Sequence, residues 1–240
     1  MNMVYTDYQS DIVQLIQKIE HSKPLVLNIS NYVIMNITAN ALLAMGASPI
    51  MSLEKREINE LVQISHSVVI NIGTLHQEFI ECAIMAAQFA HIIQIPVVLD
   101  PVGVAVSNLR KHTAYQILET GAVSVIKGNA SEVIALAGLN AMSRGVDSVH
   151  LSEEAMAAAK TLVRKYNLCV VITGEKDIIV STNNIGYIDL DIPMIKKITG
   201  MGCMASALCG AFLGCEKDNF FAAFACMYMM AVIGRETQKN

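Results

Sequence analysis

The sequence has few charges, no tryptophan and no excess of basic residues. Only 16% of its 240 residues are charged, and 17 basic against 21 acidic side chains give a net charge of −4. A protein that binds DNA or RNA carries a basic surface that neutralises phosphates, so the composition argues against a nucleic-acid partner. The hydrophobic share is 53%, which is enough apolar surface to offset the conformational entropy lost on folding. We therefore expect a folded chain with a sizeable core.

The chain also lacks an apolar run long enough to cross a membrane. Its mean hydropathy is +0.45, but the most apolar run, residues 220–234, is separated from residues 202–215 by a charged break. A membrane-spanning helix needs roughly 20 apolar residues, so two buried helices or a subunit interface are expected instead. The first residues show no basic segment followed by an apolar one, and we expect no signal peptide and a cytoplasmic location.

The cysteines lack the spacing of a disulfide framework or a metal site. None of the six forms a Cys-x-x-Cys pair. Cys203, Cys209 and Cys215 are spaced so that each step turns a helix by about 240°, and they cannot share one helix face. Reduced thiols are expected.

Short apolar runs alternate with helical patterns along most of the chain. The runs are rich in β-branched residues and show no polar alternation, which is typical of strands covered on both faces of a mostly parallel sheet. They lie at 67–72, 96–99, 122–126 and 168–172, with helical patterns at 75–93, 107–120 and 152–166 and a hairpin pattern at 177–190. We predict an α/β fold with three layers, in which a mostly parallel central sheet is flanked by helices. No linker divides the chain, so residues 1–240 are expected to form a single domain.

Polar side chains end several of the predicted strands. They are Asn28, Asn71, Asp100, Lys127 and Thr173. Because ligands bind outside the carboxyl ends of the strands in open α/β sheets, these residues predict a cleft along that edge.

Three charged residues near this edge each have two interpretations. Asp100 and Glu132 could hold Mg²⁺ on phosphates through water. Glu132 could instead complement the dipole of a helix that begins near Asn129. Lys127 either meets a phosphate or extends its ammonium group to solvent.

The segment 199–206 places Gly200 and Gly202 at the start of an apolar helix. Such a turn either presents free N–H groups to an anion or only permits close packing. It matches a dinucleotide-binding pattern, but no following strand ends in the required acidic residue, and the chain has no P-loop motif. Cys203 lies just inside the helix, where the dipole is expected to lower the pKa of its thiol. Cys203 is either a base or orienting group for a substrate hydroxyl, or a small buried hydrophobic residue.

Six segments together resemble the hydroxyethylthiazole kinases, in the order and spacing of that family. The resemblance runs from about residue 20 to residue 236. The segments are residues 24–52 and the motifs NIGTL, LDPVGV, VIKGNASE, VVITGE and ITGMGCMASA. The resemblance implies a ribokinase-like fold and phosphorylation, by ATP with Mg²⁺, of the hydroxyethyl group of 4-methyl-5-(2-hydroxyethyl)thiazole in thiamine salvage. It also implies a homotrimer with sites between subunits.

The same resemblance assigns roles to individual residues. Cys203 takes the position of the active-site cysteine, and Asp100 and Glu132 match acidic residues linked to Mg²⁺ and phosphate. The other assignments are Met51, Gly200 and Asn28 for the thiazole, and Lys127, Thr173, Asn129 and Gly202 for ATP.

The chain departs from the family pattern at three places. Ala105 stands where a glycine is usual, Met201 stands where a small residue or threonine is common, and members usually continue well past Arg235, so we expect this chain to lack their C-terminal tail. Two alternatives stay open: a kinase of another small heteroaromatic alcohol such as a hydroxymethylpyrimidine, and an inactive regulator that binds thiazole or thiamine. The joint presence of Lys127 and Thr173 with the two carboxylates argues against the regulator.

Overall fold

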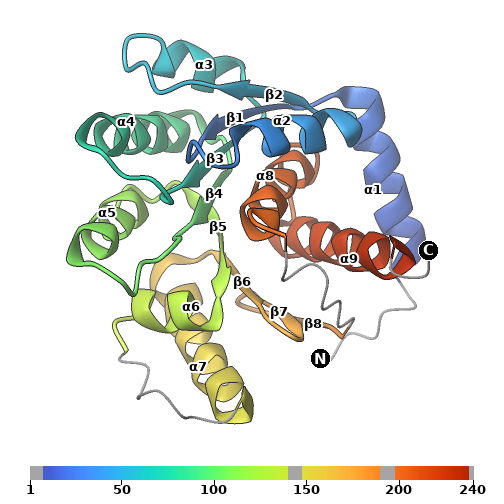
Figure 1. Cartoon of the computed structure of the whole chain (residues 1–240). Coiled ribbons are helices and arrows are strands. Elements are labelled where there is room, and N and C mark those ends of the chain that lie inside the picture. Colours follow the sequence, from blue (N-terminus) through green and yellow to red (C-terminus); the bar gives the residue numbers. More distant parts are fainter. Residues whose placement is uncertain (1–7, 140–147, 190–197, 238–240) are drawn as a thin grey trace.

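A computed structural model describes residues 8–139, 148–189 and 198–237 of the chain. These residues form a mixed sheet of eight strands in the order β2-β1-β3-β4-β5-β6-β7-β8 (Figure 1). The first six strands in this order are parallel, and β7 and β8 form the antiparallel hairpin predicted at the edge. The strands are β1 (Leu25–Ile29), β2 (Ser48–Met51), β3 (Ser67–Asn71), β4 (Val97–Asp100), β5 (Val123–Asn129), β6 (Cys169–Thr173), β7 (Asp177–Val180) and β8 (Ile185–Ile188).

Helices cover both faces of this sheet. One face packs against α1 (Gln9–Ser22), α2 (Met35–Ala44), α8 (Met201–Leu213) and α9 (Asn219–Thr237). The other face packs against α3 (Ile58–Ile64), α4 (Gln77–Ile93), α5 (Asn108–Leu118), α6 (Ala130–Leu136) and α7 (Ser148–Tyr166). Figure 1 shows the two groups of helices on opposite sides of the strands. The three-layer α/β fold predicted from the sequence is thereby confirmed.

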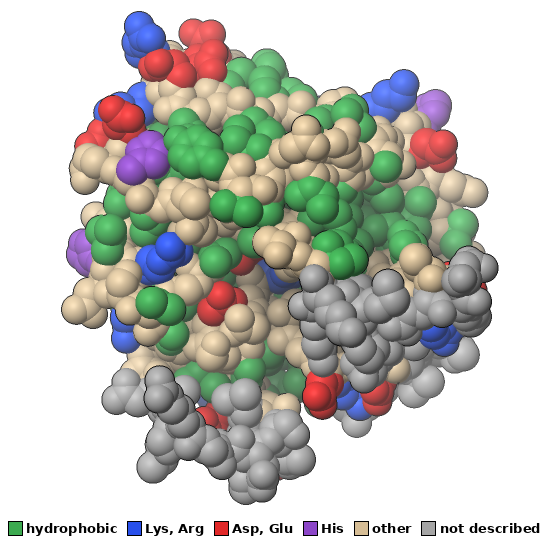
Figure 2. All heavy atoms as spheres, viewed as in Figure 1, with side chains coloured by type: hydrophobic (Ala, Val, Ile, Leu, Met, Phe, Trp, Pro, Cys, Tyr) green, Lys and Arg blue, Asp and Glu red, His purple; other side chains and the backbone are tan. Residues whose placement is uncertain are grey.

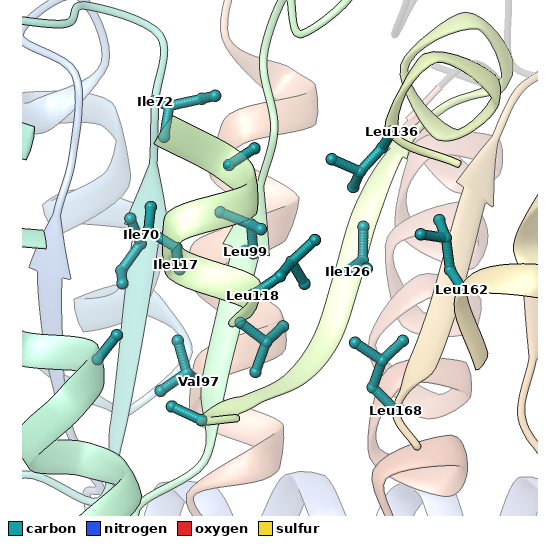
Figure 3. Close-up of a cluster of buried hydrophobic side chains, with 14 of the residues drawn as sticks. Ile70, Ile72, Val97, Leu99, Ile117, Leu118, Ile126, Leu136, Leu162 and Leu168 are labelled. Carbon is teal, nitrogen blue, oxygen red and sulfur yellow. The ribbon is translucent and has the colours of Figure 1, made fainter. Parts of the chain in front are cut away.

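The unbroken apolar character of the strands follows from this double coverage. Successive side chains of a strand point to opposite faces, so in β4 Val98 joins the core on the side of α8 while Val97 and Leu99 join the core on the other side. Figure 3 shows Val97 and Leu99 beside Ile117 and Leu118 of α5. A strand buried in this way has no polar face.

The C-terminal apolar segment forms two helices, as predicted. Among the described helices, α9 has the length and hydropathy of a membrane span, but half of its most apolar window is buried inside the protein. It packs against α8 and the sheet. The apolar character of α9 is therefore explained by its packing in the protein core.

Candidate active site

The carboxyl ends of the parallel strands meet the first two turns of α8. The Lys127 ammonium of β5 donates to the carbonyl oxygen of Gly202 at 2.8 Å, and the Ser206 hydroxyl of α8 donates to Asp100 Oδ2 of β4 at 2.7 Å. The face seen in Figure 2 is hollowed near its centre, where acidic and basic side chains lie among apolar ones. The cleft predicted at this edge therefore has α8 as one of its walls.

Gly200 sets the start of α8. It is the N-cap residue and has a φ of +87°, and a Cβ at this position would lie 2.5 Å from Ile34 Cγ2. A side chain is excluded both by this left-handed backbone and by the contact. The first backbone N–H groups of a helix have no partner within the helix, so this glycine allows the positive end of α8 to approach the strand edge closely.

Asp100 is the most deeply buried carboxylate of this edge, with 4% of its surface exposed. Its Oδ2 atom accepts hydrogen bonds at 2.7 Å from Asn71 Nδ2 and at 2.7 Å from the Ser206 hydroxyl. Burial raises the pKa of the Asp100 carboxyl, and the Lys127 charge and these donors oppose that shift. The carboxylate is thus fixed in place by neighbouring side chains.

Two asparagines extend this network toward Cys203. Asn71 Oδ1 accepts from Asn31 Nδ2 at 2.7 Å and from the Gly73 N–H at 3.0 Å. Asn31 Nδ2 also lies 3.8 Å from Cys203 Sγ. The orientation of both amides is fixed, because Asn71 must donate to the Asp100 carboxylate.

The prediction that the dipole of α8 lowers the pKa of the Cys203 thiol is wrong. Burial raises this pKa to about 11, and the nearby Asp100 charge adds to the increase. A thiol with that pKa is ionised in about one molecule in ten thousand at pH 7. Cys203 therefore faces this network as a neutral thiol.

Lys127 lies at a cavity of about 370 Å³ beside the start of α8. Its side chain is 2% exposed, which excludes the interpretation that its ammonium extends to solvent. Thr173 from the end of β6 lines the same cavity, together with Gly200 and Gly202. Four residues predicted from the sequence are thus brought to one cavity.

Glu132 lies in the first turn of α6, where an acidic side chain complements the helix dipole, as one of its two interpretations predicted. Glu132 Oε2 accepts from the Asn129 N–H at 2.9 Å, and Asn129 Oδ1 accepts from the Glu132 N–H at 3.0 Å, which makes a capping box. Glu132 Oε1 accepts from the Gly103 N–H at 2.9 Å. Burial raises the pKa of the Glu132 carboxyl, and the Asp100 charge contributes to the rise. The roles of Asn129 in ATP binding and of Glu132 in metal binding stay predictions.

Asn28 and Met51 are neighbours in the sheet, paired in register between β1 and β2. Met51 is half-buried on the edge strand, and Asn28 is 1% exposed. Asn28 Nδ2 donates to the Val26 carbonyl at 2.9 Å, while Asn28 Oδ1 is buried without a hydrogen-bond partner in the described part of the chain. The pair lies outside the residues that line the cavity with Lys127.

Three residues of this edge received no role from the sequence. Asn31 and Ser206 belong to the network around Asp100, and Arg110 donates to three backbone carbonyls of the adjoining loops. Ser206 follows Cys203 by one helical turn, which is a signal that the sequence does contain. Arg110 lies in an ordinary helical pattern and gives no such signal.

The donor groups can be compared with the needs of a metal ion. No cluster of three or more His, Cys, Asp or Glu side chains able to hold one occurs in the residues that the structure covers. Mg²⁺ typically binds through one or two carboxylates together with substrate phosphates and water. Asp100 and Glu132 fit an ion of this kind, since they lie close enough for the Asp100 charge to raise the pKa of Glu132.

The comparison with protein families decides the identity. The model of the hydroxyethylthiazole kinase family matches residues 16–240. The chain belongs to this family. The hydroxyethylthiazole kinase of Vibrio atlanticus (strain LGP32) is 43% identical over 229 residues, which cover 95% of this chain and 88% of that relative.

Solved structures agree with the family assignment. A hydroxyethylthiazole kinase protein from Pyrococcus horikoshii OT3 superposes with a TM-score of 0.85 at 32% identity, covering 93% of this chain and 84% of that one. Pyridoxal kinase of Bacillus subtilis, solved as an ADP complex, gives a TM-score of 0.64 at 16% identity, covering 85% of this chain and 88% of that one. The second likeness shows a shared fold only.

Proposed function

We propose that this hydroxyethylthiazole kinase family member transfers the terminal phosphoryl group of ATP to the hydroxyl of 4-methyl-5-(2-hydroxyethyl)thiazole, a step of thiamine salvage. The observation that carries the proposal is the contact between the Lys127 ammonium and the Gly202 carbonyl. It places a buried positive charge at the N-terminal end of α8, next to an open cavity. Phosphoryl transfer depends mainly on positioning and on stabilising negative charge, and this arrangement supplies both.

ATP would occupy the cavity lined by Lys127 and Thr173. The Lys127 charge and the free N–H groups of the first turn of α8 would receive the phosphates, as helix N-termini commonly do. Gly202 would allow the close approach of the phosphoryl group because it carries no side chain. Asn129 would contact the nucleotide through its side-chain amide nitrogen, because its side-chain oxygen already caps α6.

Mg²⁺ would be held by Asp100 and Glu132, through water and together with the phosphates of ATP. When bound, it would neutralise charge that develops on the transferred phosphoryl oxygens. Both carboxylates are already oriented by hydrogen bonds within the protein. Their fixed position at the edge of the sheet therefore supports a role in metal binding.

The thiazole alcohol would lie between β2 and the start of α8, near Met51, Asn28 and Gly200. Met51 offers a flexible apolar surface suited to a flat ring. Asn28 is paired with Met51 in the sheet and would border the ring through the strand edge.

Cys203 would orient the reacting hydroxyl as a neutral thiol. Because burial keeps its pKa at about 11, the thiol can donate or accept a hydrogen bond but does not remove the hydroxyl proton in advance. The alcohol, with a pKa comparable to the 15.7 of water, is far less acidic than that thiol. The proton would leave late, as the new P–O bond forms and the bond to ADP breaks, and would pass to an oxygen of the transferred phosphoryl group or to solvent.

A homotrimer in the cytoplasm, built from single-domain subunits, completes the proposal. The segment between β1 and β2 exposes the apolar side chains Tyr32, Val33 and Leu43, and Met51 lies on the edge strand that follows it. Exposed apolar patches mark interaction sites, so this side of the chain would meet the neighbouring subunit. Light scattering coupled to size-exclusion chromatography would measure the mass of the assembly.

A coupled assay of ADP release tests the function. The alcohols compared are the thiazole alcohol, a hydroxymethylpyrimidine and several sugars, each with and without Mg²⁺. We expect turnover with the thiazole alcohol to exceed the others at least tenfold and to require Mg²⁺. Equal or higher turnover with the pyrimidine would reassign the substrate, and thiazole binding without nucleotide binding in calorimetry would favour a regulator.

A further inference from the structure

Arg110 joins two loops that carry the proposed active site. It lies in the first turn of α5, which is capped by Ser107, and its side chain is half-buried. Its Nη1 atom donates to the carbonyl oxygens of Ile72 and Val102, both at 2.7 Å, and its Nη2 atom donates to the Gly73 carbonyl at 2.9 Å. One guanidinium group therefore bonds the segment after β3 and the segment after β4.

The segment after β3 leads from Arg110 to the network around Asp100. Gly73, whose carbonyl accepts from Arg110, donates its N–H to Asn71 Oδ1 at 3.0 Å. Asn71 in turn donates to Asp100 Oδ2 at 2.7 Å. A displaced Gly73 would remove one of the bonds that fix the Asn71 amide.

The segment after β4 leads from Arg110 to Glu132. Val102, whose carbonyl accepts from Arg110, is followed by Gly103, which donates its N–H to Glu132 Oε1 at 2.9 Å. Gly103 has a φ of +67°, and a Cβ at this residue would be 3.5 Å from Arg110 Cδ. The loop thus packs directly on the stem of the arginine.

The chemistry of these contacts requires an arginine. A guanidinium presents five donors in a rigid planar fork, whereas an ammonium is a point charge on a flexible stem. Among the ion pairs formed by the residues described, none includes Arg110. Within the described residues, its side-chain hydrogen bonds go to loop carbonyls, so its charge serves to hold the backbone of the two loops.

We propose that Arg110 is a positioning residue for phosphoryl transfer. It fixes the loops after β3 and β4 relative to each other, and through these loops it fixes the positions of the Asp100 and Glu132 carboxylates. This inference rests on the proposed kinase function. Arg110 is not among the residues that line the cavity with Lys127. Its loss should therefore lower the rate of the chemical step more than it weakens the binding of either substrate.

The test compares Arg110→Ala and Arg110→Lys with Lys111→Ala, which removes the neighbouring cation of the same helix. For Arg110→Ala we expect kcat to fall at least 50-fold while the KM values for ATP and the thiazole alcohol change less than about threefold. The kcat of Arg110→Lys should fall less than that of Arg110→Ala. Added guanidinium at low millimolar concentration should restore part of the kcat of Arg110→Ala. Lys111→Ala should match the wild type. A kcat of Arg110→Ala within threefold of the wild type, or equal losses in kcat and in both KM values, would overturn the proposal.

A second measurement separates this proposal from the kinase function itself. Amide hydrogen exchange does not depend on turnover, and in Arg110→Ala it should become at least tenfold faster in both loops, 72–74 and 101–106, with β3 and β4 still protected. Unchanged exchange in either loop would contradict the coupling, whatever the substrate is. If the wild-type protein does not phosphorylate the thiazole alcohol but exchange in both loops is still faster in Arg110→Ala than in the wild type, the coupling through Arg110 holds and only the proposed function fails.

Discussion

Asp100 and Glu132 lie at the same edge of the sheet, but the protein holds them in different ways. Asp100 ends a buried strand and accepts hydrogen bonds from the side chains of Asn71 and Ser206. Glu132 lies in the first turn of α6 and accepts only backbone N–H groups, those of Gly103 and Asn129, in the bonds described. The two carboxylates therefore depend on different parts of the structure.

The difference indicates different duties. The Lys127 charge and a hydrogen bond with Cys203 both act to lower the pKa of the Asp100 carboxyl. The charge of Asp100 therefore acts on the groups nearest to the proposed transfer. Glu132 fastens the loop after β4 to α6, so a change at Glu132 first alters the shape of that loop. We expect the loss of charge to determine the effect of a substitution at Asp100, and the changed shape of the loop to determine it at Glu132.

The largest expected effect comes from Asp100→Asn. The change keeps the size of the side chain but removes a charge that faces Lys127, and loss of one preorganised electrostatic group costs about 10²–10³ in kcat. We expect kcat to fall about a thousandfold in steady-state kinetics. Ser206→Ala is the matched control, since it removes one hydrogen bond to the same oxygen and should cost only about fivefold. Comparable losses in both variants would mean that the hydrogen bonds, rather than the charge, matter at Asp100.

A smaller effect is expected from Glu132→Gln. The amide keeps one acceptor oxygen but loses the charge-assisted bonds, worth about 1.5 kcal/mol or more, so kcat should fall roughly tenfold and the Mg²⁺ concentration for half-maximal rate should rise. Asn129→Ala removes the other half of the capping box and keeps the carboxylate. If Asn129→Ala changes the Mg²⁺ dependence as much as Glu132→Gln does while its affinity for ATP without Mg²⁺ is unchanged in calorimetry, Glu132 acts only as a cap.

This contrast also marks what the sequence could predict. The three-layer fold follows from apolar runs without alternation, because strands covered on both faces need no polar side chains. The polar residues that end those runs located the edge, including Asp100 and Lys127. Strand β2 and helix α3 were not predicted, since they are short elements of four and seven residues whose pattern is too brief to show a period.

The hydrogen-bond network around Asp100 could not be predicted from the sequence, for a physical reason. Asn31 follows β1, Asn71 ends β3 and Ser206 lies in α8, so these residues are far apart in the chain. The parallel pairing of β1 with β3 and of β3 with β4, together with the packing of α8, brings them into the network around Asp100. The pKa of Cys203 was predicted in the wrong direction because the helix dipole can be inferred locally, whereas burial and the Asp100 charge depend on the folded structure. The contacts of Arg110 are equally non-local.

Cys203→Ser tests the part of the network next to Asp100 with a moderate effect. A thiol that is neutral at pH 7 acts through a hydrogen bond, worth about 1 kcal/mol, and serine retains a hydroxyl in the same place. We expect turnover to fall about fivefold without being abolished. Complete loss of turnover with nucleotide binding intact in calorimetry would instead give the sulfur a role that a hydroxyl cannot replace.

The smallest effect concerns the pH dependence of stability. Burial raises the pKa of the Glu132 carboxyl, so the folded protein still binds a proton at a pH where the unfolded chain, with an ordinary value of about 4.3, has released it. The free energy of unfolding contributed by Glu132 therefore falls as the pH rises from about 4.3 through the raised pKa. Denaturant unfolding across that range should show a flatter dependence for Glu132→Gln than for the wild type, while Asn129→Ala, which keeps the carboxyl, should retain the slope. If the free energy of unfolding instead falls more steeply with pH in Glu132→Gln than in the wild type, the bonds from Gly103 and Asn129 outweigh burial. The pKa of the Glu132 carboxyl would then be lowered in the folded protein rather than raised.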